Sequence, residues 1–204
     1  MQTFRTTQHL EQEKRKLFSS SSRILIKVGT AVLTNDDGSF DAKTFQHLCY
    51  QLAELKRAGK EIVLVTSGAI GFGKVLFNLE EPLTVSSQQS SAAAGQILLM
   101  GRYLEEFSKY DIKIAQLLLT RENFSDRKSL ANLWGCISKL FYLGAIPIIN
   151  ENDVISSDEL QHSTTFGDND VLASMAAKSL IVGSILFLSD VDGLLDANGN
   201  LISY

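Results

Sequence analysis

Residues 23–29 read RILIKVG, an apolar run that contains one lysine and is closed by a glycine. Short runs of this kind, bounded by turn residues, are typical of strands buried in a parallel sheet. Residues 61–66, EIVLVT, have the same character. Between the two runs, residues 41–58 place apolar side chains at helical spacing, with Asp41 as a cap signal and Gly59 as a stop signal. This unit predicts two parallel strands joined by a crossover helix.

The same alternation continues through the rest of the chain. The remaining short apolar runs predict strands at residues 112–118, 145–149 and 184–188, and the last of these strands is expected to be buried. Helices are predicted after Ser67 and at residues 86–108, 126–143 and 171–180. Pro147 favours an early or edge position for its strand. Residues 154–166 form an irregular polar excursion, and Asn198-Gly199 predicts a tight hairpin. We therefore expect an α/β fold with a mostly parallel sheet sandwiched between helices in three layers.

The chain is expected to consist of one domain at residues 23–204, preceded by a flexible N-terminal extension at residues 1–22. The extension ends in four serines, Ser19–Ser22, and polar termini are often unpinned. A short charged helix at residues 9–18 is the alternative. The remaining sequence shows neither an internal repeat nor an inter-domain linker.

The composition indicates a globular protein and argues against several classes of function. Of the 204 residues, 45% are hydrophobic and 21% are charged, and the net charge is −4. No stripe of Lys and Arg is present, so we expect no nucleic-acid partner. No apolar run reaches the roughly 18 residues of a membrane span, so we expect no membrane partner. The two cysteines, Cys49 and Cys136, and the three histidines are scattered, which argues against a metal site and favours a cytoplasmic location.

Polar side chains gather where the predicted strands end. These groups are Lys27 and Gly29, Ser67 and Gly68, Asn150-Glu151-Asn152-Asp153, Asp168-Asn169-Asp170, and Ser189-Asp190. Open parallel sheets bind ligands beyond the carboxyl ends of their strands. The sequence therefore predicts a polar cleft at this edge of the sheet.

Each group in this cleft also has a purely structural interpretation. Lys27 and the backbone N–H groups near Gly29 suit an anion such as phosphate, but a lysine at a strand end also reaches solvent. Ser67 suits an anionic ligand at a helix N-terminus, but serine is also a good helix cap. The chain lacks both the Walker-type loop and the dinucleotide fingerprint.

The amides and carboxylates of the later groups suit a small zwitterion. The alternatives are turn chemistry for residues 150–153 and helix capping for residues 168–170. Asp168 or Asp170 would equally orient a lysine or lie near Mg²⁺, which takes few carboxylates.

Taken together, these segments resemble the glutamate 5-kinase family of the amino acid kinase superfamily. The matching motifs are IKVGT (26–30), VTSGAI (65–70), AGQ (94–96), QLLLT (116–120), IINEND (148–153), FGDND (166–170) and LSDVDGL (188–194). The resemblance extends from about residue 23 to about residue 202. Its most specific part is the pair NEND and GDND.

The resemblance implies ATP-dependent phosphorylation of the γ-carboxylate of L-glutamate with Mg²⁺, the first step towards proline. Carried over residue by residue, it makes Lys27 and Asp170 catalytic. It assigns glutamate binding to Ser67, Asp153 and Asn169, ATP binding to Lys27, Gly29, Ser189 and Asp190, and supporting roles to Gly68, Asn152 and Asp168. It also implies a homo-oligomer and feedback inhibition by proline.

Members of this family continue beyond the point that corresponds to Tyr204. The resemblance implies a glycine-rich segment with a second lysine there, and in many members a PUA domain. We therefore expect the C-terminal part of the fold to be missing. Two other interpretations stay open: a non-catalytic remnant that binds glutamate or proline, and a sister kinase that acts on another carboxylate.

Overall fold

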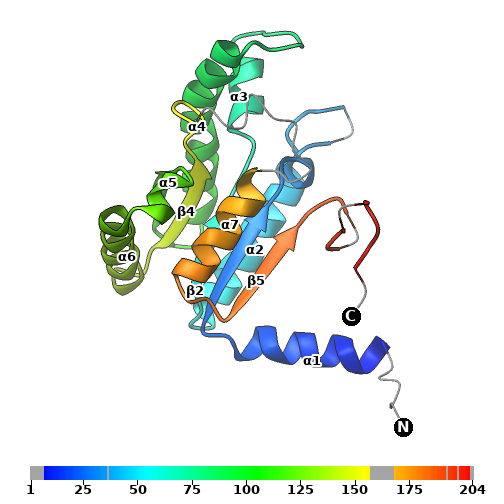
Figure 1. Cartoon of the computed structure of the whole chain (residues 1–204), viewed down its shortest axis with the longest axis vertical. Coiled ribbons are helices and arrows are strands. Elements are labelled where there is room, and N and C mark those ends of the chain that lie inside the picture. Colours follow the sequence, from blue (N-terminus) through cyan, green and yellow to red (C-terminus); the bar gives the residue numbers. More distant parts are fainter. Residues whose placement is uncertain (1–6, 36, 157–167, 192, 197, 203–204) are drawn as a thin grey trace.

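The computed structural model describes residues 7–35, 37–156, 168–191, 193–196 and 198–202 (Figure 1). In that part of the chain, five strands form one sheet with the order β3-β4-β2-β1-β5. The strands are β1 (Arg23–Val28), β2 (Glu61–Val65), β3 (Ile114–Leu119), β4 (Ile146–Glu151) and β5 (Ser184–Leu188). Each neighbouring pair is parallel, which confirms the predicted α/β class.

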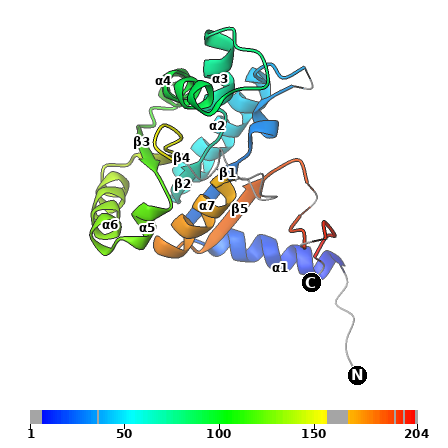
Figure 2. The ribbon, with the colours of Figure 1, turned by 45° about the horizontal axis from the view of Figure 1, so that its top comes forward.

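Helices cover both faces of this sheet (Figure 2). One side carries α2 (Ala42–Arg57) and α4 (Val85–Ser108), with α3 (Ala69–Leu76) packed against α4. The other side carries α5 (Glu122–Ser125), α6 (Arg127–Tyr142) and α7 (Asp168–Ser179). Helix α1 (Thr7–Ser20) precedes β1, and a 3-10 turn, η1 (Thr30–Leu33), follows it. The expected three-layer architecture is therefore confirmed.

Local sequence signals set the ends of the helices. The Asp41 carboxylate accepts hydrogen bonds from the backbone N–H groups of Lys43 and Thr44, and so caps α2. Asp126 accepts from the N–H of Ser129 in the same way and caps α6. These caps satisfy N–H groups that have no partner within the helix.

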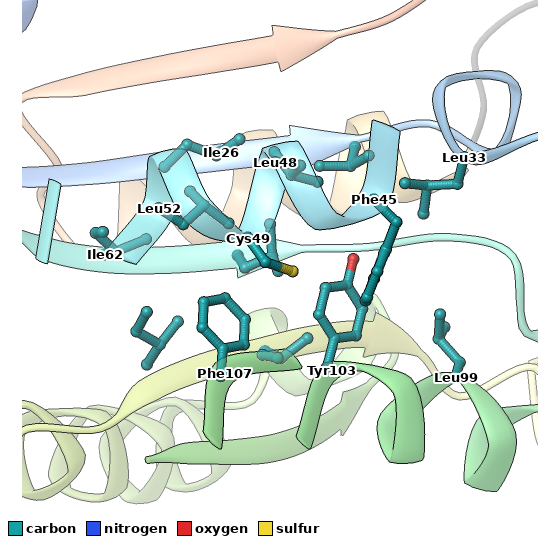
Figure 3. Close-up of a cluster of buried hydrophobic side chains, with 14 of the residues drawn as sticks. Ile26, Leu33, Phe45, Leu48, Cys49, Leu52, Ile62, Leu99, Tyr103 and Phe107 are labelled. Carbon is teal, nitrogen blue, oxygen red and sulfur yellow. The ribbon is translucent and has the colours of Figure 1, made fainter. Parts of the chain in front are cut away.

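Two separate hydrophobic clusters flank the sheet, because successive side chains of a strand point to opposite faces. In β1, Ile24 and Ile26 face the cluster under α2 and α4, whereas Leu25 faces the cluster under α6 and α7. Figure 3 shows the first cluster, in which Cys49 of α2 and Tyr103 of α4 lie among other buried side chains. Burial of both faces explains why the central strands are apolar almost throughout.

The predictions for two strands have different outcomes. Strand β4 pairs with β3 on one side and β2 on the other, so of the two positions that Pro147 favoured, early or edge, the structure has the early one. Pro147 is tolerated because it is the second residue of β4 and pairing with β2 begins only at Ile148. Strand β5 is not buried: it lies at an edge of the described sheet, where Phe187 is 41% exposed.

The boundaries of two elements change the local environment of site residues. Strand β4 continues to Glu151, so Asn150 is a buried strand residue and not part of a turn. Helix α7 begins at Asp168, three residues before its predicted start, so Asn169 and Asp170 belong to its first turn. Most of the polar excursion expected at residues 154–166 lies outside the described residues.

The described residues near the N-terminus contact the sheet, and those near the C-terminus form a hairpin. The expected extension, residues 1–22, contains α1, and the hydroxyl of Ser21 is 2.6 Å from that of Ser184. Near the other end, the Asn198-Gly199 turn brings Leu195 and Leu201 together in an antiparallel bridge, as predicted. Among the described residues, no helix is long and apolar enough to cross a membrane.

Candidate active site

The carboxyl ends of β1, β2 and β4 meet the first turn of α7 at one edge of the sheet. Lys27 is the last residue but one of β1, and its Cα is in register with that of Val65 at the end of β2. The Lys27 side chain is only 8% exposed. Its ammonium lies 2.6 Å from the Oδ1 atom of Asp170 on α7. The interpretation of Lys27 as a strand-end lysine that reaches solvent is therefore wrong.

This ion pair explains how a cation is accommodated beside an apolar strand. An unpaired ammonium is costly to bury, whereas a pair with a carboxylate offsets part of the desolvation. The Asp170 side chain is 33% exposed, so solvent reaches the pair from the carboxylate side.

Gly29 leaves space around this ammonium. A Cβ atom at position 29 would lie 3.3 Å from the Nζ atom of Lys27. The Gly29 N–H donates to the carbonyl of Leu188, which extends the β1–β5 pairing by one residue. That N–H is therefore not available to an anion, and the expectation that it faces phosphate is corrected.

Four side chains from four elements form a hydrogen-bonded chain, which we call the amide relay: Gln96, Asn150, Asn169 and Ser67. The Nδ2 group of Asn150 donates to Gln96 Oε1 at 2.7 Å. The Nδ2 group of Asn169 donates both to Asn150 Oδ1 at 3.2 Å and to Ser67 Oγ at 3.0 Å. Residues from α4, β4, α7 and the loop after β2 are thereby joined.

Ser67 is part of this relay and does not cap α3. The cap position is occupied by Gly68, which makes no side-chain hydrogen bond and has a φ of 108°. A left-handed φ of this size is accessible to glycine and strained for other residues. Gly68 therefore turns the chain into α3, and the hydroxyl of Ser67, one residue earlier, accepts from Asn169.

Close packing of α3 on α4 holds the Ser67 loop near the relay. A Cβ atom at Gly95 of α4 would lie 1.8 Å from the carbonyl oxygen of Ala69, and one at Gly73 would lie 1.9 Å from that of Ser91. The two helix backbones are thus in direct contact. Gln96, which follows Gly95, is fixed relative to the start of α3.

Asp153 and Asn152 line a neighbouring cavity. This cavity, of about 330 Å³, lies between α4, β3 and the residues after β4, and Gln96 and Glu151 also contribute to its wall. Asn152 keeps its place because its N–H donates to the carbonyl of Leu119. The structure therefore groups Ser67 with Asn169 directly, and places Asp153 at a cavity that Gln96 also lines.

The remaining predicted residues lie around the cleft. Ser189 and Asp190 follow β5 beside Gly29, and the Ser189 hydroxyl donates to the Asp190 carboxylate at 3.2 Å. Both are exposed. Asp168 is the first residue of α7, but its side chain lies outside the described part of the structure.

A buried hydroxyl pair supports the end of β2. Thr66 Oγ1 lies 2.8 Å from the hydroxyl of Tyr103, and both residues have no exposed surface. Burial raises the pKa of the Tyr103 hydroxyl well above its usual value, so the group remains neutral in the folded protein. This pair connects the strand that precedes Ser67 to α4.

Comparison with known proteins identifies the family. A sequence model of the amino acid kinase family matches residues 22–203. The chain belongs to the amino acid kinase family. It is 42% identical over 188 residues to a glutamate 5-kinase of Streptococcus thermophilus and 38% identical over 188 residues to one of Streptococcus agalactiae. Each alignment covers 92% of this chain and 70% of the relative. The resemblance to glutamate 5-kinases is thus confirmed.

Two residues of this candidate site were not predicted as site residues. Gln96 is part of a motif that carries the resemblance, and Asn150 belongs to a polar group, but neither was assigned a role in binding. A signal for Gln96 was available: it is a large amide within an alanine- and leucine-rich stretch of α4, where burial of an amide requires a hydrogen-bond partner.

Proposed function

We propose that this chain catalyses ATP-dependent phosphorylation of the γ-carboxylate of L-glutamate, giving γ-glutamyl phosphate. One observation carries the proposal: consecutive residues of α7 hold the two halves of the site. Asn169 joins the amide relay that ends at Ser67, and Asp170 pairs with the buried Lys27. An amino-acid site and a cation for phosphate therefore share one edge of the sheet.

The relay has the chemistry of an amino-acid site. Because Asn169 Nδ2 donates to Ser67 Oγ, the hydroxyl hydrogen of Ser67 remains to donate to a substrate carboxylate. Asn169 Oδ1 is buried and makes no hydrogen bond to any described residue, so it is an acceptor for a substrate ammonium. Asp153, at the neighbouring cavity, would provide a carboxylate for the same ammonium.

The chemistry of the reaction fits a site without a nucleophilic side chain. The γ-carboxylate of glutamate is ionised at pH 7, so it needs no general base to attack phosphorus. Catalysis then consists of holding two anions in line and offsetting the charge of the phosphoryl group during transfer. Lys27 would supply that positive charge, with Asp170 as the residue that positions its ammonium.

We place the nucleotide beside Gly29, Ser189 and Asp190. These residues lie at the adjoining ends of β1 and β5, next to Lys27. Mg²⁺ is proposed to arrive with the phosphates of ATP, since proteins bind it through few carboxylates. No group of three or more His, Cys, Asp or Glu residues in the described part of the chain would hold a metal ion.

Proline and a second copy of the chain are proposed as further partners, and the cytoplasm as the location. Proline carries an α-carboxylate and a cationic nitrogen, so it presents the same groups to the relay as glutamate. A homo-oligomer is favoured by apolar side chains that line the 330 Å³ cavity: Ile97 is 74% exposed, Leu118 38% and Val154 45%.

A hydroxamate assay tests the substrate and the reaction together. The chain is incubated with ATP, Mg²⁺, hydroxylamine and, in separate reactions, glutamate, aspartate, N-acetylglutamate or carbamate. We expect ATP-dependent hydroxamate with glutamate only. A preference for another acid would make the chain a sister kinase, and glutamate binding in calorimetry without product would make it a binding protein.

A further inference from the structure

Gln96 lies outside the groups expected to touch glutamate, yet it makes the shortest link of the amide relay. It is 7% exposed, and its Oε1 atom accepts from Asn150 Nδ2 at 2.7 Å. Asn150 is itself 2% exposed. A hydrogen bond between two buried amides couples their orientations, because each needs a partner for the polar atom that it turns towards the other.

The link fixes more than position, because a primary amide donates at nitrogen and accepts at oxygen. Gln96 presents its oxygen to Asn150, so Asn150 must turn its nitrogen towards α4 and its oxygen towards α7. The Asn150 oxygen then receives Asn169 Nδ2. If the Gln96 amide were reversed, every later group in the relay would be driven to reverse as well.

The polarity of the relay determines what the cleft offers to a ligand. Both hydrogens of Asn169 Nδ2 are used, one on Asn150 and one on Ser67. The acceptor Asn169 Oδ1 and the hydroxyl hydrogen of Ser67 are left for a ligand. A reversed relay would instead offer a donor at Asn169, which repels an ammonium group.

Gln96 is held in this role by the fold. Gly95 brings the α4 backbone against that of Ala69, so the residue after Gly95 has a fixed distance to the Ser67 loop. The Gln96 Nε2 group is buried and makes no hydrogen bond to any described residue, and the side chain lines the cavity that also contains Asn152 and Asp153. The hydrogen bond that its Oε1 atom accepts from Asn150 therefore couples the Gln96 amide to the relay.

We propose that Gln96 is a positioning residue that sets the donor and acceptor polarity of the glutamate site through Asn150 and Asn169. The inference rests on the proposed function, because it takes glutamate as the ligand whose ammonium donates to the acceptor oxygen of Asn169. Gln96 itself does not touch glutamate. Its removal should weaken glutamate binding while ATP binding is unaffected.

The test compares three variants by calorimetry of glutamate binding and by the glutamate and ATP dependence of turnover. Gln96→Met removes the acceptor, and we expect a glutamate Kd and KM about tenfold higher, as for the loss of one hydrogen bond to a charged group. Gln96→Glu keeps an acceptor for Asn150 and should stay within about threefold of wild type. Gln116→Met, a glutamine on the wall of the same cavity but outside the relay, should bind glutamate like wild type.

A double-mutant cycle shows whether Gln96→Met weakens glutamate binding by changing the polarity of the relay or by changing the packing around position 96. In an Asn150→Asp background, the group next to Asn169 is an acceptor whatever Gln96 does, so Gln96→Met should then raise the glutamate Kd by no more than about twofold. If Gln96→Met raises the glutamate Kd equally in wild type and in Asn150→Asp, the inference is overturned. If Gln96→Met does not fold, Gln96→Glu decides alone: a tenfold loss of affinity overturns the inference, and retention supports it.

Measurements on the wild-type chain distinguish failure of the proposed function from failure of the role assigned to Gln96. Wild type that binds glutamate, with Gln96→Met binding equally well, overturns the role of Gln96 and leaves the proposed function intact. Wild type that neither binds nor phosphorylates glutamate overturns the proposed function and the role of Gln96 with it. A fall in kcat alone, with glutamate KM unchanged, also contradicts the inference.

Discussion

The ammonium of Lys27 and the carboxylate of Asp170 lie 2.6 Å apart, and they connect the end of the first strand to the first turn of α7. The residue before Asp170 is Asn169, which donates to Ser67. One helical turn therefore positions both the proposed phosphate-facing cation and the proposed glutamate-facing amide. Any movement of this turn would change both halves of the site together.

Replacing Asp170 by Asn should slow turnover and leave glutamate binding nearly unchanged. The amide carries no charge, so Lys27 loses the ion-pair partner that positions its ammonium. We expect kcat to fall about tenfold or more, as for a weakened charge-assisted hydrogen bond, with glutamate KM within about threefold of wild type. Steady-state kinetics at varied glutamate measures both. A large rise in glutamate KM with unchanged kcat would place Asp170 in the amino-acid site instead.

Ser67→Ala should affect glutamate binding more than turnover. The substitution removes the donor proposed for a substrate carboxylate and an acceptor for Asn169, so glutamate KM should rise about 10- to 100-fold. Ser174→Ala is the matched control, because the Ser174 hydroxyl bonds only within α7, to the carbonyl of Asp170. Equal effects of the two substitutions would show that the Ser67 hydroxyl has no special role.

Gly95→Ala should destabilise the protein, whereas Gly101→Ala on the same helix should not. A methyl group at position 95 would lie 1.8 Å from a backbone oxygen, so α3 and α4 must move apart, at a cost of about 3 kcal/mol. Position 101 has open space, and alanine there should stabilise α4 by about 0.5–1 kcal/mol. Urea unfolding curves give both values. A Gly95→Ala variant as stable as wild type would contradict the close approach of the helices.

The cap at Asp41 should contribute a pH-dependent part of the stability. The hydroxyl and the N–H of Thr44 lower the pKa of this carboxyl below its usual value, so the folded state favours the ionised form. Its contribution is present above about pH 4, the usual carboxyl pKa, and is lost as the pH falls through the lower pKa of the folded state. Asp41→Asn keeps a good cap that does not titrate. We expect the melting temperature of the variant, relative to wild type, to rise as the pH falls from 5 towards 2.5. A difference independent of pH would contradict this account.

The sequence predicted the strands and most helix ends because these depend on local signals. Asp41 caps α2 as the sequence predicted, and the helix predicted to begin at Asp126 begins at Arg127 with Asp126 as its cap. The polar residues after each strand meet at one edge because the strands are parallel. The position of β4 was not predictable from Pro147, since proline restricts pairing only at its own residue.

The amide relay could not be predicted from the sequence for a different reason. Gln96 and Asn150 are 54 positions apart in the chain, and Asn169 and Ser67 are 102 apart. Their contacts depend on the packing of α4 and α7 on opposite sides of the same sheet. Sequence motifs indicated that the residues matter, but only the three-dimensional structure shows in which order they bond.

The most direct test of the account is the rate of γ-glutamyl hydroxamate formation by Lys27→Met, compared with wild type and with Lys43→Met, which replaces an exposed lysine on α2. Lys27 is proposed to offset the charge of the phosphoryl group, so its loss should reduce kcat at least about 100-fold, while glutamate Kd stays within about threefold. Lys43→Met should match wild type. Equal hydroxamate formation by wild type and Lys27→Met would contradict the central claim that this buried cation serves phosphoryl transfer to glutamate.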